Sequence, residues 1–239
     1  GILIDNAVDL VSSKMPSITD ERFRDALQEA EKNCFAVGLT TVDDCGLSAE
    51  AVEKIKSLQS KHELKMRLYI MLSDDRKNFE YLQQQGIIKT YRLNVRGFKV
   101  YGDGALGSRG ACLLEPYSDK PGHYGFLLSK PAHFDSVAAW IAKTNFQMCT
   151  HAIGDSGNRT ILKIYANYLQ GKNDNRWRIE HAQVINPEDF HFFSQYSIIP
   201  SVQPTHATSD MYWASERLGK ERVKGAYAFK QLLDENGWL

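Results

Sequence analysis

The feature of this sequence that most constrains its fold is a regular alternation between short apolar runs and longer amphipathic stretches. The amphipathic stretches repeat their apolar residues at the spacing of a helix, as between Phe23 and Cys34. No run of adjacent β-hairpins interrupts this order, so successive strands are expected to be joined by helical crossovers and to lie parallel. The predicted fold class is therefore α/β, either a doubly wound sheet or a partial (β/α)8 barrel that lacks two of its eight strands. The six expected strands cover residues 39–43, 65–72, 95–101, 146–151, 177–181 and 197–203.

Polar residues mark where the predicted helices begin. Thr19 is followed by two acidic residues, and Ser48 directly precedes the next stretch of helical periodicity. Both arrangements are typical of helix N-termini, where a side-chain oxygen accepts a backbone hydrogen bond and negative charge favours the helix dipole. Residues 73–75 open a third helix, and residues 131–145 form a fourth. Between strand and helix, the glycine-rich segment 102–128 is predicted to be a long connection.

Charge and cysteine content exclude several classes of protein. The sequence of 239 residues contains 29 basic and 29 acidic residues, so it lacks the basic excess of a nucleic-acid or membrane-surface binder. No apolar run approaches the roughly 20 residues of a membrane helix, and the N-terminus does not resemble a signal peptide. The four cysteines form no C-x-x-C pair, which favours reduced thiols in a cytoplasmic protein. These cysteines are Cys34, Cys45, Cys112 and Cys149.

Two of the expected strands end in histidine. His151 and His181 are 30 residues apart (181 − 151), which is about one strand-and-helix unit. In a barrel, this spacing places both imidazoles on the C-terminal rim, on adjacent strands, where active sites are built. A single histidine at a strand end is equally typical of a cap that hydrogen-bonds a carbonyl group. Two histidines at equivalent strand ends favour a site for Zn²⁺ or a similar divalent ion.

Lys99 lies inside an otherwise apolar strand, between Phe98 and Val100. By strand alternation its neighbours face the opposite side of the sheet. An unpaired ammonium group inside a barrel is costly, so Lys99 requires an ion pair, Schiff-base chemistry or conversion to a carbamate. The alternative is an edge-strand lysine whose ammonium group reaches solvent.

Residues 102–107 match the G-x-G-x-x-G pattern of dinucleotide-binding proteins, but the context disagrees. The pattern requires a helix that opens at the glycines, whereas turn-forming residues follow here. Asp103 also places a negative charge where the pyrophosphate would bind. An NAD-dependent oxidoreductase is therefore the weakest of the functional alternatives.

Taken together, several segments resemble the metal-dependent amidohydrolase superfamily, specifically its YtcJ-like branch, amidohydrolase family 3. They occur in the order of the family and span nearly the whole chain. The resemblance implies a (β/α)8 barrel that holds one or two divalent metals and hydrolyses amide-like bonds. The matching segments are residues 38–44 (GLTTVDD), 99–109 (KVYGDGALGSR), 151–155 (HAIGD), 178–183 (RIEHAQ) and 201–206 (SVQPTH).

The resemblance assigns roles to particular residues. Lys99 would be carbamylated and become an anionic bridging ligand, while His151 and His181 would bind the metal. Zn is the expected metal, with Fe, Mn or Ni as alternatives. The five residues in or near these motifs that we expect to contact a small-molecule substrate are Asp103, Arg109, Gln203, His206 and Trp213.

The family pattern also predicts what the chain lacks. None of the seven histidines has a partner two residues away, so the strand-one His-x-His pair is absent, and the strand-eight aspartate would follow Leu239. We therefore expect residues 1–239 to be an incomplete barrel domain without its small β-sandwich, an internal fragment with no catalytic base. The prediction is a hydrolase of non-peptide C–N bonds that is inactive as this fragment and whose open sheet edges favour a homo-oligomer. The alternative is a catalytically silent barrel that acts as a regulator or binding module.

Overall fold

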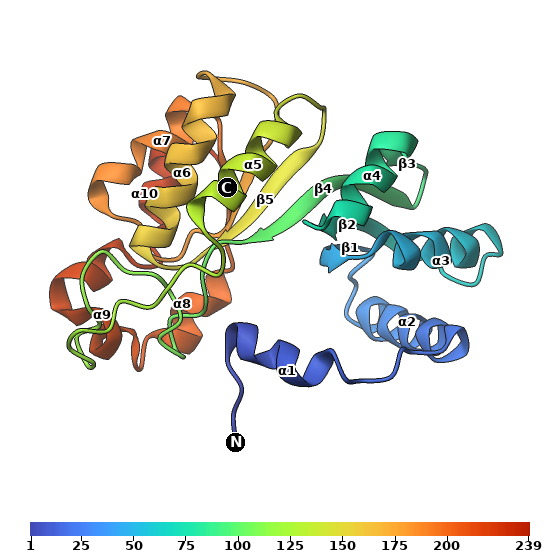
Figure 1. The fold of residues 1–239 in the computed structure, drawn as a ribbon, viewed down its shortest axis with the longest axis horizontal. Helices are drawn as coiled ribbons and strands as arrows, with labels where there is room; N and C mark the ends of the chain where they lie inside the picture. Colours follow the sequence, from blue (N-terminus) through green and yellow to red (C-terminus); the bar gives the residue numbers. More distant parts are fainter. The chain divides into compact units, whose positions relative to one another are not determined.

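The computed structural model describes residues 1–239 and divides into two compact units (Figure 1). The smaller unit comprises Val11–Lys99, and the larger comprises Gly1–Leu10 together with Val100–Leu239. Strands alternate with helices in both units, as the sequence predicts. None of the helices combines the length and apolar character needed to cross a bilayer. All four cysteines are free thiols.

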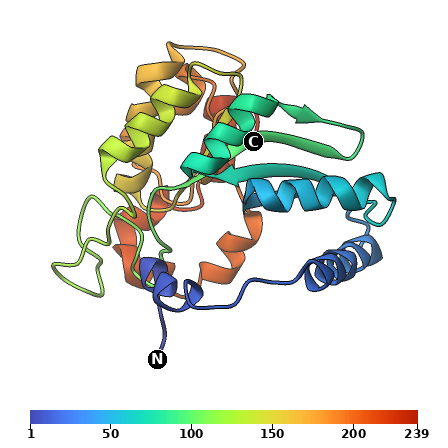
Figure 2. The ribbon, with the colours of Figure 1, turned by 45° about the vertical axis from the view of Figure 1, so that its right-hand side comes forward.

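The smaller unit contains three parallel strands, with β2 hydrogen-bonded to β1 on one side and to β4 on the other. A two-residue strand, β3, pairs antiparallel with β4 and was not predicted, because it is too short to show any periodicity. Figure 2 shows α2 beside α3, where Lys54 of α3 forms an ion pair with Asp20 of α2. The elements are α2 (Asp20–Ala36), β1 (Thr41–Leu47), α3 (Ala49–Ser60), β2 (Arg67–Ser73), α4 (Arg76–Gln85), β3 (Ile88–Lys89) and β4 (Leu93–Tyr101).

The helices of the smaller unit begin directly after the polar residues that the sequence marks as helix starts. The side chains of Thr19, Ser48 and Asp75 each accept a hydrogen bond from a backbone N–H in the first turn of α2, α3 and α4. These caps satisfy donors that a helix start otherwise leaves unpaired. Apolar residues of α3 and α4 are buried together with those of the strands, and the ring of Phe79 contacts that of Phe98 with centroids 4.5 Å apart.

The larger unit contains a second set of three parallel strands, in which β6 lies between β5 and β7. Figure 1 shows α5 and α6 packed side by side along β5. The elements of this unit are η1 (Asp5–Val8), α5 (Pro131–Ile141), β5 (Gln147–Ala152), α6 (Asp155–Leu169), β6 (Arg178–His181), η2 (Pro187–Asp189), α7 (His191–Gln195), β7 (Ile199–Ser201), α8 (Pro204–Asp210), α9 (Ala214–Arg222), η3 (Val223–Gly225) and α10 (Phe229–Asn236); α1 (Asp9–Ser12) crosses the boundary.

The strand expected at residues 197–203 is shorter than predicted. Only Ile199–Ser201 pairs with β6, because the N–H of Ile198 is bonded to the carbonyl oxygen of Phe193 in α7 and Pro204 begins α8. Proline favours the first turn of a helix, so the strand pattern is cut off there.

The segment between β4 and α5 folds as an irregular connection, as its glycine content predicts. Its apolar residues enter a buried cluster with residues that follow β5 and β6, so the connection is anchored to the unit. The members of this cluster are Leu106, Ala111, Leu113, Tyr117, Ile153, Val184, Leu218 and Ala226.

Candidate active site

The structure brings His151 and His181 together at the carboxyl ends of β5 and β6. Their ring centroids are 4.7 Å apart and the rings meet edge to face, at 74°. The pairing of the strands explains this closeness, since His151 lies opposite Glu180 and Ala152 lies opposite His181. Two imidazoles from adjacent strand ends therefore face one another, as the 30-residue spacing predicts.

His181 sits at a break in the backbone. Its φ is +76°, and that of Ala182 is +42°. Residues with a Cβ rarely adopt this left-handed region, and such strain persists only where the surroundings hold it, frequently at functional sites. The strand ends at His181, so the side chain of this residue is not placed by the regular strand alternation. The alternation of apolar and polar residues in the sequence does not predict these positive φ angles.

The side chain of Gln203 holds the ring of His181. Its Oε1 lies 2.6 Å from Nδ1 of His181, and its Nε2 lies 3.4 Å from the carbonyl oxygen of Ser201. His206, on the first turn of α8, stacks on the face of the same ring, with centroids 5.5 Å apart and planes 23° apart. Two of the residues predicted to contact substrate, Gln203 and His206, thus lie against a predicted metal ligand.

Asp103 supports His151 from a fully buried position. Its carboxylate accepts hydrogen bonds from the backbone N–H groups of Cys112, Ile153 and Gly154, at 2.8 to 2.9 Å. One carboxylate oxygen lies 3.7 Å from Nε2 of His151. Burial, with a smaller contribution from the charge of Asp5, raises the pKa of Asp103 to about 7, although the three N–H donors act in the opposite direction.

Tyr101 is a site residue that the sequence analysis missed. Its ring centroid is 5.8 Å from that of His151, and the residue is 46 % exposed at the end of β4. A signal was present, because Tyr101 lies within the 99–109 segment that resembles the family. The rings of Tyr101, His151, His181 and His206 form a continuous row in the larger unit.

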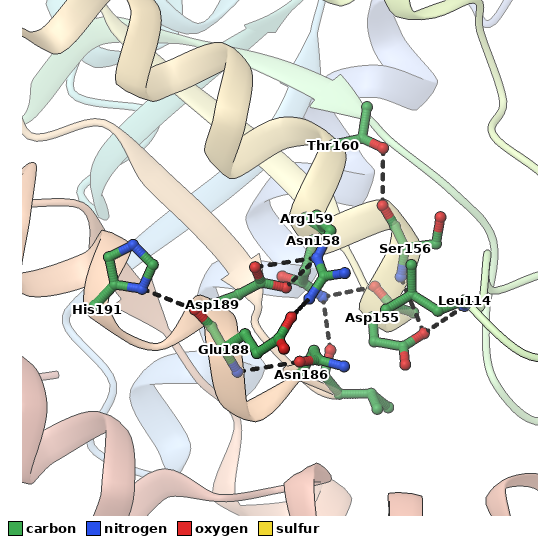
Figure 3. Close-up of polar contacts among 12 residues, drawn as sticks. Leu114, Asp155, Ser156, Asn158, Arg159, Thr160, Asn186, Glu188, Asp189 and His191 are labelled. Atoms are coloured by element: carbon green, nitrogen blue, oxygen red, sulfur yellow. Dashed lines mark hydrogen bonds and ion pairs between the residues drawn. The ribbon is translucent and has the colours of Figure 1, made fainter.

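Asn158 ties together the two connections that follow the histidines (Figure 3). The residue is fully buried, and its Nδ2 donates to the carbonyl oxygens of Ala152, Gly154 and Val184, at 3.0 to 3.2 Å. Ala152 follows His151 directly, and Val184 comes three residues after His181. One side chain in the first turn of α6 therefore fixes both strand ends.

Two further polar contacts hold the same region (Figure 3). Asp155, the first residue of α6, accepts a hydrogen bond from the N–H of Leu114 at 2.9 Å, and burial raises the pKa of its carboxyl. Arg159, one turn along the helix, donates to both oxygens of Asp189 and to Glu188. The start of α6 is thus bonded to the 102–128 connection on one side and to η2 on the other.

A second polar cluster anchors the far end of α8. The hydroxyl of Tyr227 donates to Asp210 at 2.8 Å and accepts from Gln183 at 2.9 Å. Burial, together with the hydrogen bond to Asp210, raises the pKa of Tyr227 well above its usual range. Because Gln183 is only two residues beyond His181, this cluster connects α8 back to the end of β6.

The polar and ring contacts of Arg109 and Trp213 are with residues other than the two histidines. The guanidinium of Arg109 forms two hydrogen bonds with Asp119, which also pairs with Arg217. Trp213 lies close to Gly107 and packs against the buried cluster of the larger unit, with Arg217 over its ring. The contacts of both residues are therefore with the 102–128 connection and α9.

Lys99 is the last residue of the smaller unit. It is 3 % exposed near the end of β4, paired in register with Ser73 of β2. This burial agrees with the expectation that Lys99 faces an enclosed environment.

The donor set fits a divalent metal in part. Neutral imidazole is a favoured ligand of Zn²⁺ and related ions, and a ligating histidine normally hydrogen-bonds through its other ring nitrogen, as Nδ1 of His181 does with Oε1 of Gln203. The His, Cys, Asp and Glu side chains of the chain form no group of three or more positioned to hold a metal. His151 and His181 are thus suited to provide two ligands of a larger set.

The structure is similar to solved metal-dependent hydrolases. An uncharacterized metal-dependent hydrolase from Pyrococcus furiosus superimposes with a TM-score of 0.83 at 26 % identity, over 95 % of this chain and 47 % of that chain. The parallel strands and helices are therefore part of a (β/α)8 barrel of the metal-dependent hydrolase type, which confirms the predicted fold class.

The sequence comparisons identify the family. The model of the amidohydrolase family matches residues 1–238, and the chain belongs to this family. It is 33 % identical to Protein LONG AFTER FAR-RED 3 of Arabidopsis thaliana over 100 % of the chain and 44 % of that protein. It is 28 % identical to the putative amidohydrolase YtcJ of Bacillus subtilis over 98 % of the chain and 45 % of that protein. The chain thus spans about half the length of the curated relatives it matches.

Proposed function

We propose that the protein carrying this chain is a metal-dependent hydrolase of amide-like, non-peptide C–N bonds, with His151 and His181 as metal ligands. The observation that carries the proposal is the meeting of these two imidazoles, 4.7 Å apart at adjacent strand ends, in a member of the amidohydrolase family. A divalent metal in such a site supplies Lewis-acid polarisation of the substrate carbonyl and a water of lowered pKa.

The other predicted roles form part of the same proposal. Lys99 is proposed as a carbamylated ligand, and Zn as the metal before Fe, Mn or Ni. Asp103, Arg109, Gln203, His206 and Trp213 remain candidate contacts of a small-molecule substrate. The ring contacts favour His206 among them, because it lies directly against His181.

The chain on its own is proposed to be inactive. It spans less than half of its relatives and brings together two imidazoles, whereas a catalytic metal site requires three protein ligands and a base within reach. The four free thiols support a cytoplasmic location.

The test is the metal content of the full-length protein, measured by inductively coupled plasma mass spectrometry after dialysis, together with hydrolysis of a panel of N-acyl and formamide compounds. We expect at least one equivalent of a transition metal and measurable turnover. Both are expected to fall sharply in the His151→Ala and His181→Ala variants. His62→Ala, which removes an exposed histidine of the smaller unit, is the matched control and should change neither.

Two results would contradict the proposal in different ways. Full metal content in both histidine variants would show that the metal lies elsewhere. A folded full-length protein with no metal and no turnover would favour the silent barrel, a regulator or binding module that keeps the fold without the chemistry.

A further inference from the structure

We propose that Gln203 is a positioning residue that fixes the hydrogen of the His181 ring on Nδ1 and thereby presents Nε2 to the metal. This inference rests on the proposed function, since it gives His181 a metal to bind. It assigns Gln203 a role through His181 in addition to its candidate contact with substrate.

The geometry of the amide determines the direction of the hydrogen bond. Nε2 of Gln203 lies 3.4 Å from the carbonyl oxygen of Ser201, which can only accept, so the amide nitrogen faces the backbone. The amide oxygen therefore faces His181, at 2.6 Å from Nδ1. Because an amide oxygen is only an acceptor, Nδ1 must carry the hydrogen, and the lone pair of the neutral ring is on Nε2.

The backbone around Gln203 keeps this side chain in place. Gln203 is extended, with φ −117° and ψ 100°, immediately before Pro204, the first residue of α8. Proline restricts the residue before it to extended conformations, so Gln203 cannot join the helix. Its side chain is therefore held between the end of β7 and the ring of His181.

His181 needs such support because its own backbone is strained. At φ +76° the last residue of β6 departs from regular strand geometry, so strand alternation does not fix the direction of its ring. Gln203 fixes one edge of the ring, and His206 stacks on its face. An acceptor of this kind orients the metal-binding nitrogen, and its loss typically costs 10- to 100-fold in metal affinity.

The test compares two substitutions of nearly equal size in the full-length protein. Gln203→Met removes the acceptor and keeps the length of the side chain, whereas Gln203→Glu keeps an acceptor for Nδ1–H. Gln195→Met, at an exposed position on α7, is the matched control. The first readout is the ring tautomer of His181 in the metal-free protein, by nitrogen-15 NMR at roughly pH 8, above the usual histidine pKa of about 6.5. The His181 signals are assigned by their absence in His181→Gln. The second readout is the Kd for Zn²⁺.

The proposal predicts an Nδ1–H ring in the unaltered protein, in Gln203→Glu and in Gln195→Met, and a mixture of tautomers in Gln203→Met. The Kd for Zn²⁺ should rise about 10- to 100-fold in Gln203→Met alone. An unchanged tautomer in Gln203→Met would overturn the inference, as would an Nε2–H ring in the unaltered protein. A tautomer that changes as predicted in a protein that binds no Zn²⁺ would support the role of Gln203 and contradict the proposed function, so the two failures are distinguishable.

Discussion

His151 and His181 are residues of the same type at equivalent strand ends, but the protein supports their side chains differently. His151 lies within the regular strand β5 and has beside it a fully buried carboxylate, Asp103, which is itself held by three backbone N–H groups. His181 lies on a left-handed backbone and is bonded to a partly exposed neutral amide, Gln203.

The difference separates two physical roles. The carboxylate of Asp103 binds three backbone N–H groups and so joins the 102–128 connection to the segment after β5, which contributes to stability as well as to the placement of His151. The amide of Gln203 makes one short bond to the ring and one long bond to the backbone, so it contributes mainly to the orientation of the ring. The loss of Asp103 should therefore lower the stability of the larger unit. The loss of Gln203 should alter the orientation of the His181 ring and leave the fold intact.

Asp103→Ala is the change with the largest expected effect. It leaves the N–H groups of Cys112, Ile153 and Gly154 buried without their acceptor, and each unsatisfied buried donor costs about 1 to 3 kcal/mol. We expect the free energy of unfolding to fall by at least about 3 kcal/mol in urea titrations followed by circular dichroism.

The matched control is Asp174→Ala, which removes an exposed carboxylate paired with Arg176. Surface ion pairs contribute little, so its effect should stay below about 1 kcal/mol. A loss for Asp103→Ala no greater than that of this control would contradict the structural role of the carboxylate.

Asn158→Ala should affect both strand ends at once. The variant removes the donor to Ala152, Gly154 and Val184, so we expect a loss of about 2 kcal/mol in the free energy of unfolding. The NMR signals of His151 and His181 should both shift in the folded variant. A shift confined to one histidine would show that the two ends are held independently.

Tyr227→Phe should affect the His181 side alone. The missing hydroxyl leaves Asp210 and Gln183 each without one hydrogen bond, at a cost of about 1 kcal/mol in the free energy of unfolding. In the same urea titrations and NMR spectra, His151 should keep the signals of the unaltered protein. A shift of the His151 NMR signals as large as that of the His181 signals would contradict the independent support of the two histidines.

The smallest expected effect is a pH dependence on the His151 side. Burial raises the pKa of the Asp155 carboxyl in the folded protein, whereas an aspartate in the unfolded chain has a pKa of about 3.9. The folded state therefore binds the carboxyl proton more tightly than the unfolded state. The contribution of Asp155 to stability is therefore full below about pH 4 and falls as the pH rises through the raised pKa.

Asp155→Asn keeps an oxygen for the N–H of Leu114 and cannot ionise, so it lacks this slope. Urea titrations at several pH values between 4 and 7 should show the unaltered protein losing stability relative to the variant as the pH rises. A relative gain over the same interval would mean that the hydrogen bonds to Asp155 outweigh its burial.

The sequence predicts features that depend on neighbouring residues. The alternation of strands and helices, the caps at Ser48 and Asp75, and the histidines at the strand ends are all local patterns. The supports of the histidines depend on contacts between distant residues. Asp103 bonds to Ile153, 50 positions away, and Gln203 contacts His181, 22 positions away. A single sequence contains no signal for such pairs, nor for the positive φ of His181.

The most direct test of the account is X-ray absorption at the zinc edge of the Zn²⁺-loaded full-length protein, compared with its His151→Ala and His181→Ala variants at equal zinc occupancy. The account predicts imidazole scattering from the metal environment that decreases by about one ring in each variant, because both strand ends supply a ligand to one site. Unchanged imidazole scattering in both variants would contradict the claim that these two histidines converge on a metal.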